Sequence, residues 1–321
     1  MGGVRLSTAD APPPSFACAP PGTTFCNFRL LTADDVVKAV RELPDKHCIR
    51  DPMATGLFKQ VAEVIAPFFV ELFNRSLSEG SVPSVFRAAY VTPLLKKPDL
   101  DSSDVKSYRP ISNLSVLSKL LERLVARQLL DYLNGARLLP SLQSAYRAYH
   151  STETAVLKVV SDILWAVDSG NLSLLALLDL SSAFDTVDHS ILLHRLDRTY
   201  GLKGTTLSWF ASYLDSRTWY IRCRASRSRP TLLKCGVPQG SVLGPILFLL
   251  YTADLVGLIE SFGLSPHLYA DDTQVYGYTI PSAAMHLQES LSTCIDRVAE
   301  WLRSSRLQLN EAKTEFFMEH I

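Results

Sequence analysis

Residues 267–276 read HLYADDTQVY, and this stretch decides the fold of the 321-residue chain. Aromatic and β-branched residues on both sides of the two aspartates predict a β-hairpin with Asp271-Asp272 as its two-residue tip. Two adjacent carboxylates repel each other unless water screens them or a cation lies between them. The tip is therefore either a solvated loop or part of a site for two divalent metal ions about 4 Å apart, the arrangement that serves phosphoryl transfer.

A third carboxylate ends a predicted strand. Residues 174–180 read LLALLDL, a continuous apolar run that is typical of a strand buried on both faces. Asp179 lies at the end of this run, where an aspartate is rare unless it is paired or bound to a metal. The order strand, helix, hairpin, helix predicts an antiparallel α+β sheet that brings Asp179 beside the hairpin. Oxygen ligands without His or Cys nearby favour Mg²⁺, with Mn²⁺ as the alternative.

Apolar residues at helical spacing predict the elements around these strands. Thr32, Ser151 and Asp188 are suited to cap helices. A strand is expected over residues 87–97, and residues 1–27 are expected to form an irregular leader. We expect helices over residues 56–77 (kinked or divided at Pro67), 117–129, 151–169, 190–200, 205–214, 241–259 and 282–304.

Composition excludes few function classes. Lys+Arg and Asp+Glu balance at 32 each, so the net charge does not indicate nucleic acid. Basic residues gather in residues 195–234, which either follow a phosphate backbone or form a solvated hairpin. The six cysteines contain no Cys-x-x-Cys, which argues against structural zinc and fits a reducing, intracellular compartment. The longest apolar run, residues 242–251, is too short to span a bilayer, and no membrane is expected.

Several motifs resemble those of reverse transcriptases, in the expected order. The three central ones are residues 179–189 (DLSSAFDTVDH), 236–248 (GVPQGSVLGPILF) and 269–272 (YADD). Four others resemble LINE-type, non-LTR retrotransposon enzymes, closest to the chicken-repeat clade: residues 108–113 (YRPISN), 118–123 (SKLLER), 143–154 (QSAYRAYHSTET) and 307–314 (LQLNEAKT). The resemblance extends from residue 28 to the C-terminus.

The resemblance implies a right-hand polymerase, with an N-terminal extension and fingers in residues 28–170. Residues 171–321 are then a palm, an antiparallel sheet backed by helices. It implies an RNA-directed DNA polymerase that transfers dNTPs to a primer 3′-hydroxyl, with an RNA template and a DNA primer as partners. Asp179, Asp271 and Asp272 are implied to hold two Mg²⁺ ions. The expected places are the nucleus for function and the cytoplasm for synthesis.

The resemblance also implies roles near the incoming nucleotide. Phe184 matches an aromatic residue that excludes the sugar 2′-hydroxyl, and core packing is its alternative. Gln239 and Gly240 match a turn that presses on the nucleotide and the template. Asp185 and Asp188, in contrast, are expected to be structural, holding the turn and capping the next helix.

Three cations complete the implied site. Arg109, with Lys96 or Lys97, matches the finger residues that contact the triphosphate, and simple solubility is the alternative for the lysine pair. Lys313 matches a lysine that protonates the leaving pyrophosphate, and a surface lysine on a strand is its alternative.

Family members also carry an upstream endonuclease and a thumb. The leader is too short for the first, and the sequence stops after the last palm motif, so we expect a chain truncated before the thumb, with other retrotransposon domains as candidate partners. Two alternatives follow: a non-catalytic remnant that at most binds nucleic acid, and a palm polymerase that copies RNA into RNA. Tyr-x-Asp-Asp and Phe184 argue against the second.

Overall fold

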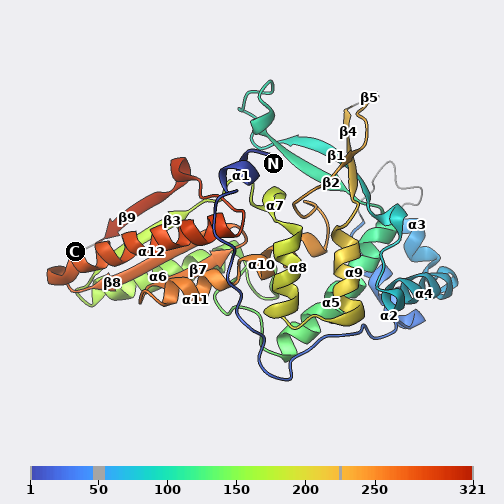
Figure 1. Cartoon of the computed structure of the whole chain (residues 1–321), viewed down its shortest axis with the longest axis horizontal. Helices are drawn as coiled ribbons and strands as arrows, with labels where there is room; N and C mark the ends of the chain where they lie inside the picture. Colours follow the sequence, from blue (N-terminus) through green and yellow to red (C-terminus); the bar gives the residue numbers. More distant parts are fainter. Residues whose placement is uncertain (1, 46–54, 224–225, 320–321) are drawn as a thin grey trace. The chain divides into compact units, whose positions relative to one another are not determined.

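The computed structural model describes residues 2–45, 55–223 and 226–319, drawn in colour in Figure 1. Contacts divide the chain into two compact units. Unit 1 consists of Met1–Ala17, Leu139–Ile191 and Leu247–Ile321, and unit 2 of Cys18–Leu138 and Leu192–Ile246. Each unit collects segments from both sides of residue 170, so the linear boundary expected there does not separate the two units.

Unit 1 is built on a four-stranded sheet with the order β7-β8-β3-β9. Its strands are β3 (Leu172–Leu178), β7 (Ser265–Tyr269), β8 (Asp272–Thr279) and β9 (Glu315–Glu319). All neighbouring strands pair in the antiparallel direction, and the β3–β8 register runs from Leu172↔Thr279 to Leu178↔Thr273. The predicted apolar strand therefore lies beside the predicted hairpin, as expected from the sequence.

Helices cover this sheet (Figure 1). They are α6 (Thr152–Asp168), α11 (Asp254–Glu260) and α12 (Ala284–Ser304). The α12 helix packs on β8 and β3, while α6 packs on β3 and β7. The buried stripe of α12 contains Leu287, Leu291, Cys294, Val298 and Leu302. Burial of each Leu or Val contributes about 1.5–3 kcal/mol, which holds α12 on the sheet.

Unit 2 has a sheet with β1 (Ala88–Leu95) at its centre. This strand pairs antiparallel with β2 (Tyr108–Asn113) and parallel with β4 (Thr218–Cys223), and β4 also pairs with β5 (Ser226–Arg227) and β6 (Thr231–Leu232). The helices of unit 2 are α2 (Ala33–Arg41), α3 (Thr55–Gln60), α4 (Ala62–Glu79), α5 (Val116–Gly135) and α9 (Gly204–Leu214). Both α8 (His189–Arg198) and α10 (Leu243–Thr252) contribute residues to each unit.

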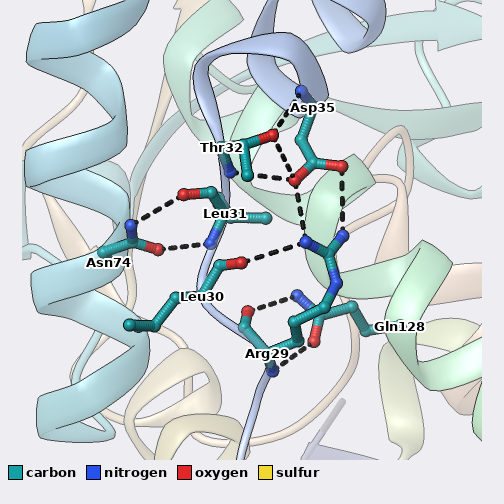
Figure 2. Close-up of polar contacts among 7 residues, drawn as sticks. All are labelled: Arg29, Leu30, Leu31, Thr32, Asp35, Asn74 and Gln128. Atoms are coloured by element: carbon teal, nitrogen blue, oxygen red, sulfur yellow. Dashed lines mark hydrogen bonds and ion pairs between the residues drawn. The ribbon is translucent and has the colours of Figure 1, made fainter.

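The segment before α2 is fixed by side-chain amides, which hydrogen-bond its backbone N–H and C=O groups as a neighbouring strand would (Figure 2). The Asn74 carboxamide bonds the N–H and C=O of Leu31 at 2.7 and 2.9 Å. The Gln128 carboxamide does the same for Arg29 at 2.7 and 3.0 Å. Thr32 caps α2 in a capping box with Asp35, which confirms the predicted cap. Hydrogen bonds from the Arg29 guanidinium, aided by Thr32, lower the pKa of the Asp35 carboxyl.

Three expected elements differ in the structure. The leader contains a short helix, α1 (Gly2–Ser7). The helix expected over residues 56–77 is divided at Val61 rather than at Pro67, which lies inside α4. A proline removes a single helical hydrogen bond, and buried residues on α4 offset this loss.

The helix expected over residues 241–259 is divided into α10 and α11. Thr252 is the last residue of α10, and its hydroxyl donates to the Phe248 carbonyl at 3.1 Å, a contact that often bends helices. In the described part of the chain, Leu243–Glu260 is the one helical stretch long and apolar enough to cross a membrane, and 67% of it is buried inside the protein.

Two arginines of the basic segment, residues 195–234, are buried, whereas Arg198, Arg227, Arg229 and Lys234 are exposed. Arg195 and Arg217 are buried at 0% and 2% exposure, so neither lies on a solvated face or reaches a phosphate backbone. Residues 224–225 of this segment lie outside the described residues.

Candidate active site

The hairpin turn carries the first correction to the expected site. The last β7–β8 pair is Tyr269↔Asp272, so the two-residue loop is Ala270-Asp271, and Asp272 already belongs to β8. Ala270 has φ +57°, because a two-residue hairpin needs a positive φ at its first loop position. A residue other than glycine loses about 1–2 kcal/mol in this conformation. The turn is therefore strained at the residue next to Asp271.

The structure brings the three predicted carboxylates together in unit 1. Asp179 directly follows β3, and the β3–β8 register of Leu178↔Thr273, continued by one residue, places it opposite Asp272. Although Asp272 stays exposed as a residue, burial raises the pKa of its carboxyl, and the negative charges of Asp271 and Asp179 raise it further. The positive charge of Lys313 acts in the opposite direction.

Asp179 is held by the segment that precedes β9. The Asn310 carboxamide donates to Asp179 Oδ2 at 2.7 Å, and the Asn310 backbone N–H donates to the Asp179 carbonyl at 2.8 Å. Lys313 Nζ lies 3.5 Å from the same Oδ2, with 68% of its side chain exposed. Such an exposed pair contributes less than about 1 kcal/mol, so Asn310 fixes the carboxylate more firmly. Sequence reasoning found Lys313 and missed Asn310, although both lie in the LQLNEAKT motif.

Phe184 is partly buried and partly exposed. It belongs to α7 (Ala183–Thr186), and its ring stacks on the ring of Phe248 with centroids 4.5 Å apart. Phe248 is fully buried, whereas Phe184 is half-buried. One part of the Phe184 side chain therefore packs on the core, and the other part is accessible to solvent. Asp188 is structural as predicted, because its Oδ1 accepts the N–H groups of Ser190 and Ile191 at 3.0 and 3.2 Å and caps α8.

Unit 2 holds the other predicted site residues. The Gln239 carbonyl accepts the Ser112 N–H at 2.8 Å, so the turn lies directly on β2. Gly240 has φ +98°, and a Cβ there would lie 2.8 Å from the Ser112 carbonyl oxygen. Only glycine fits this position. Arg109 is exposed on β2.

Lys96 and Lys97 follow β1 and are exposed, and the Lys96 N–H donates to the Ser107 carbonyl at 2.9 Å. The β1–β2 hairpin therefore presents all three predicted finger cations to solvent.

Comparison with known proteins decides the family. Residues 95–321 match the family model described as reverse transcriptase (RNA-dependent DNA polymerase). The chain belongs to the reverse transcriptase family. It is 32% identical, over 88% of its length, to a probable RNA-directed DNA polymerase from transposon BS of Drosophila melanogaster. It is 28% identical, also over 88%, to the RNA-directed DNA polymerase from mobile element jockey of the same organism.

A third relative is the Pol polyprotein of the type-1 retrotransposable element R2 of Popillia japonica, 27% identical over 77% of the chain. The chain covers 32%, 31% and 34% of these three relatives, about a third of their length. The relatives confirm the expected likeness to reverse transcriptases of LINE-type elements, and the α+β sheets fit a polymerase fold of this family. The narrower chicken-repeat clade stays a prediction.

Three acidic residues of this family member offer the type of ligand atom that a hard divalent cation prefers. Asp179, Asp271 and Asp272 offer only oxygen ligands, and their mutual repulsion is the kind that a bound cation relieves. Within residues 2–45, 55–223 and 226–319, no three His, Cys, Asp or Glu side chains converge closely enough to hold a metal. The three carboxylates therefore influence one another's charge, but their side chains do not converge on one point in the described residues.

Sequence reasoning missed a buried carboxylate that supports the Gln239 turn. Glu122 is 2% exposed on α5, and its Oε2 accepts the N–H groups of Val242 and Leu243 at 2.8 and 3.1 Å, at the start of α10. Burial raises the pKa of the Glu122 carboxyl, and the charge of Arg217 opposes this. The available signal was a glutamate on the apolar face of a helix, within the SKLLER motif.

Proposed function

We propose that this chain is the polymerase core of a non-LTR retrotransposon and copies an RNA template into DNA from a primer 3′-hydroxyl. The observation that carries the proposal is the gathering of Asp179, Asp271 and Asp272 at one end of the β3–β8 pair. In this proposal unit 1 is the palm and unit 2, with its β1–β2 hairpin, supplies the fingers. Template RNA, primer DNA and dNTPs are the partners, and other domains of the element complete the machinery.

The three aspartates would hold two Mg²⁺ ions, which when bound stabilise charge on the attacking and leaving oxygens. Asn310 orients Asp179 through its 2.7 Å hydrogen bond. Lys313 places a proton donor next to Asp179, where it serves the departing pyrophosphate. Arg109, Lys96 and Lys97 offer exposed positive charge to a triphosphate.

A primer-extension assay on the purified chain tests the proposed function. RNA and DNA templates are each combined with dNTPs or rNTPs, with and without Mg²⁺. We expect Mg²⁺-dependent addition of dNTPs on RNA. A preference for rNTPs on RNA would identify an RNA-copying polymerase instead, and a folded chain without product in any reaction would identify a non-catalytic remnant.

Replacement of Phe184 tests how the chain selects deoxynucleotides. Phe184→Ala should raise the ratio of rNTP to dNTP incorporation, because the smaller side chain leaves space for the 2′-hydroxyl. The loss of stacking on Phe248 should also lower stability. The measurement is incorporation of each nucleotide in single-turnover reactions.

Phe317→Ala is the matched control, since Phe317 lies on β9 of the same unit and is 44% exposed. It should leave the ratio unchanged. If Phe184→Ala discriminates as strongly as the parent chain, Phe184 serves only the core.

A further inference from the structure

Gln143 lies at the hairpin turn, although it is 127 residues away from Ala270 in sequence. It is 2% exposed and belongs to a short segment that adds to the outer edge of β7. The Leu268 N–H donates to the Leu142 carbonyl at 2.8 Å, and the Ser144 N–H donates to the Leu268 carbonyl at 2.9 Å. The backbone of this segment is therefore fixed in register against the hairpin.

The side chain of Gln143 reaches beyond this pairing to the turn itself. Its Oε1 accepts two N–H groups, from Ala145 at 3.0 Å and from Ala270 at 3.2 Å. Ala270 is the first residue of the two-residue loop after the last ladder pair, Tyr269↔Asp272, so its N–H takes no part in that ladder and needs another acceptor. One buried carbonyl oxygen thus joins the segment and the strained turn.

We propose that Gln143 is a positioning residue that fixes the Ala270-Asp271 turn and, through it, the direction of the Asp271 carboxylate. The inference rests on the proposed function, in which Asp271 is a metal ligand. A neutral amide oxygen suits this place, because a carboxylate would add a fourth negative charge beside Asp179, Asp271 and Asp272. Partners that orient a ligand typically change metal affinity or activity by about 10–100-fold.

The test compares Gln143→Met with Ser144→Ala. The first keeps the length of the side chain and removes the acceptor of the Ala270 N–H. The second removes the 3.1 Å contact between Ser144 Oγ and His267 Nε2, which joins the same segment to β7 away from the turn. Mn²⁺ binding to the nucleic-acid-free chain, followed by electron paramagnetic resonance, and single-turnover dNTP incorporation are measured for both variants.

We expect Gln143→Met to weaken Mn²⁺ binding and to lower the maximal incorporation rate, each by about 10–100-fold. The dNTP concentration at half-maximal rate should stay within about twofold of the parent, since the triphosphate contacts are unchanged. Ser144→Ala should leave both Mn²⁺ affinity and maximal rate near those of the parent. Equal effects of the two variants, or a change confined to the dNTP concentration dependence, would overturn the proposal.

Hydrogen exchange in the unsubstituted chain gives a second measurement that does not depend on the variants. The Ala270 amide should be strongly protected, because its acceptor is buried. Exchange of this amide at the rate of an unstructured peptide would overturn the proposal even if Gln143→Met fails to fold. A parent chain that binds Mn²⁺ but extends no primer would contradict the proposed function. In that case the Mn²⁺ affinities of Gln143→Met and Ser144→Ala would still test the positioning role of Gln143.

Discussion

Asp271→Asn should abolish Mg²⁺-dependent primer extension while the chain stays folded. Asparagine has the shape of aspartate, but it lacks the negative charge that a divalent ion requires. Loss of residues that merely orient a ligand costs about 10–100-fold, so loss of a ligand should lower the rate by more than about 100-fold. Asp179→Asn should have the same effect, because Asp179 lies opposite Asp272 on the paired strand.

The same substitution, Asp271→Asn, should not lower the stability of the metal-free chain. The charges of Asp271 and Asp179 raise the pKa of the Asp272 carboxyl, so each of them repels the Asp272 carboxylate in the folded chain. Removal of one charge relieves this repulsion. We therefore expect the melting temperature of Asp271→Asn, measured without metal, to equal or exceed that of the parent.

Asp168→Asn is the matched control, since Asp168 is exposed at the end of α6 in the same unit. It should leave both extension and melting temperature unchanged. Mg²⁺-dependent extension that survives in either Asp179→Asn or Asp271→Asn would refute the assignment of the metal ligands.

Glu122→Gln should lower the free energy of unfolding by about 1–3 kcal/mol, the usual cost of weakening the hydrogen bonds of a buried charged group. The substitution leaves the Arg217 guanidinium, which is 2% exposed, without its nearby negative charge. It also weakens the acceptor of the Val242 and Leu243 N–H groups at the start of α10. Urea unfolding measures the change as a lower midpoint with an unchanged slope.

A double-mutant cycle measures the interaction between Glu122 and Arg217 apart from the effect of each substitution on packing. Arg217→Met alone should also destabilise, and Glu122→Gln with Arg217→Met should cost less than the sum of the two single changes. Glu63→Gln is the control, because Glu63 on α4 forms an ion pair with Arg41 while 76% of its side chain is exposed. A Glu122→Gln midpoint as close to the parent as that of Glu63→Gln would show that the buried charge contributes little.

Features that depend on neighbours in sequence could be predicted. The apolar run before Asp179 and the alternating residues around the aspartates predicted β3 and the hairpin, because side-chain periodicity follows from backbone geometry. Caps at Thr32, Ser151 and Asp188 were predicted for the same reason, since a capping side chain bonds N–H groups only two or three residues away.

Features that depend on distant partners could not be predicted. The turn residues are Ala270-Asp271 because cross-strand pairing sets the register of the hairpin, and a one-residue shift would reverse its faces. Asn310 reaches Asp179 across 131 residues, and Glu122 reaches Val242 across 120. A sequence motif shows that such residues are present, but their pairing arises only when packing closes these long loops.

The sequence by itself thus determined the three carboxylates, the strands that carry them and the family to which the chain belongs. The tertiary structure decided which residues orient those carboxylates and how discontinuous segments form the two units. The physical reason is the sequence separation of the interacting residues. Periodicity and capping act within a few residues, whereas register, burial and charge pairing require parts of the chain that meet only in the folded protein.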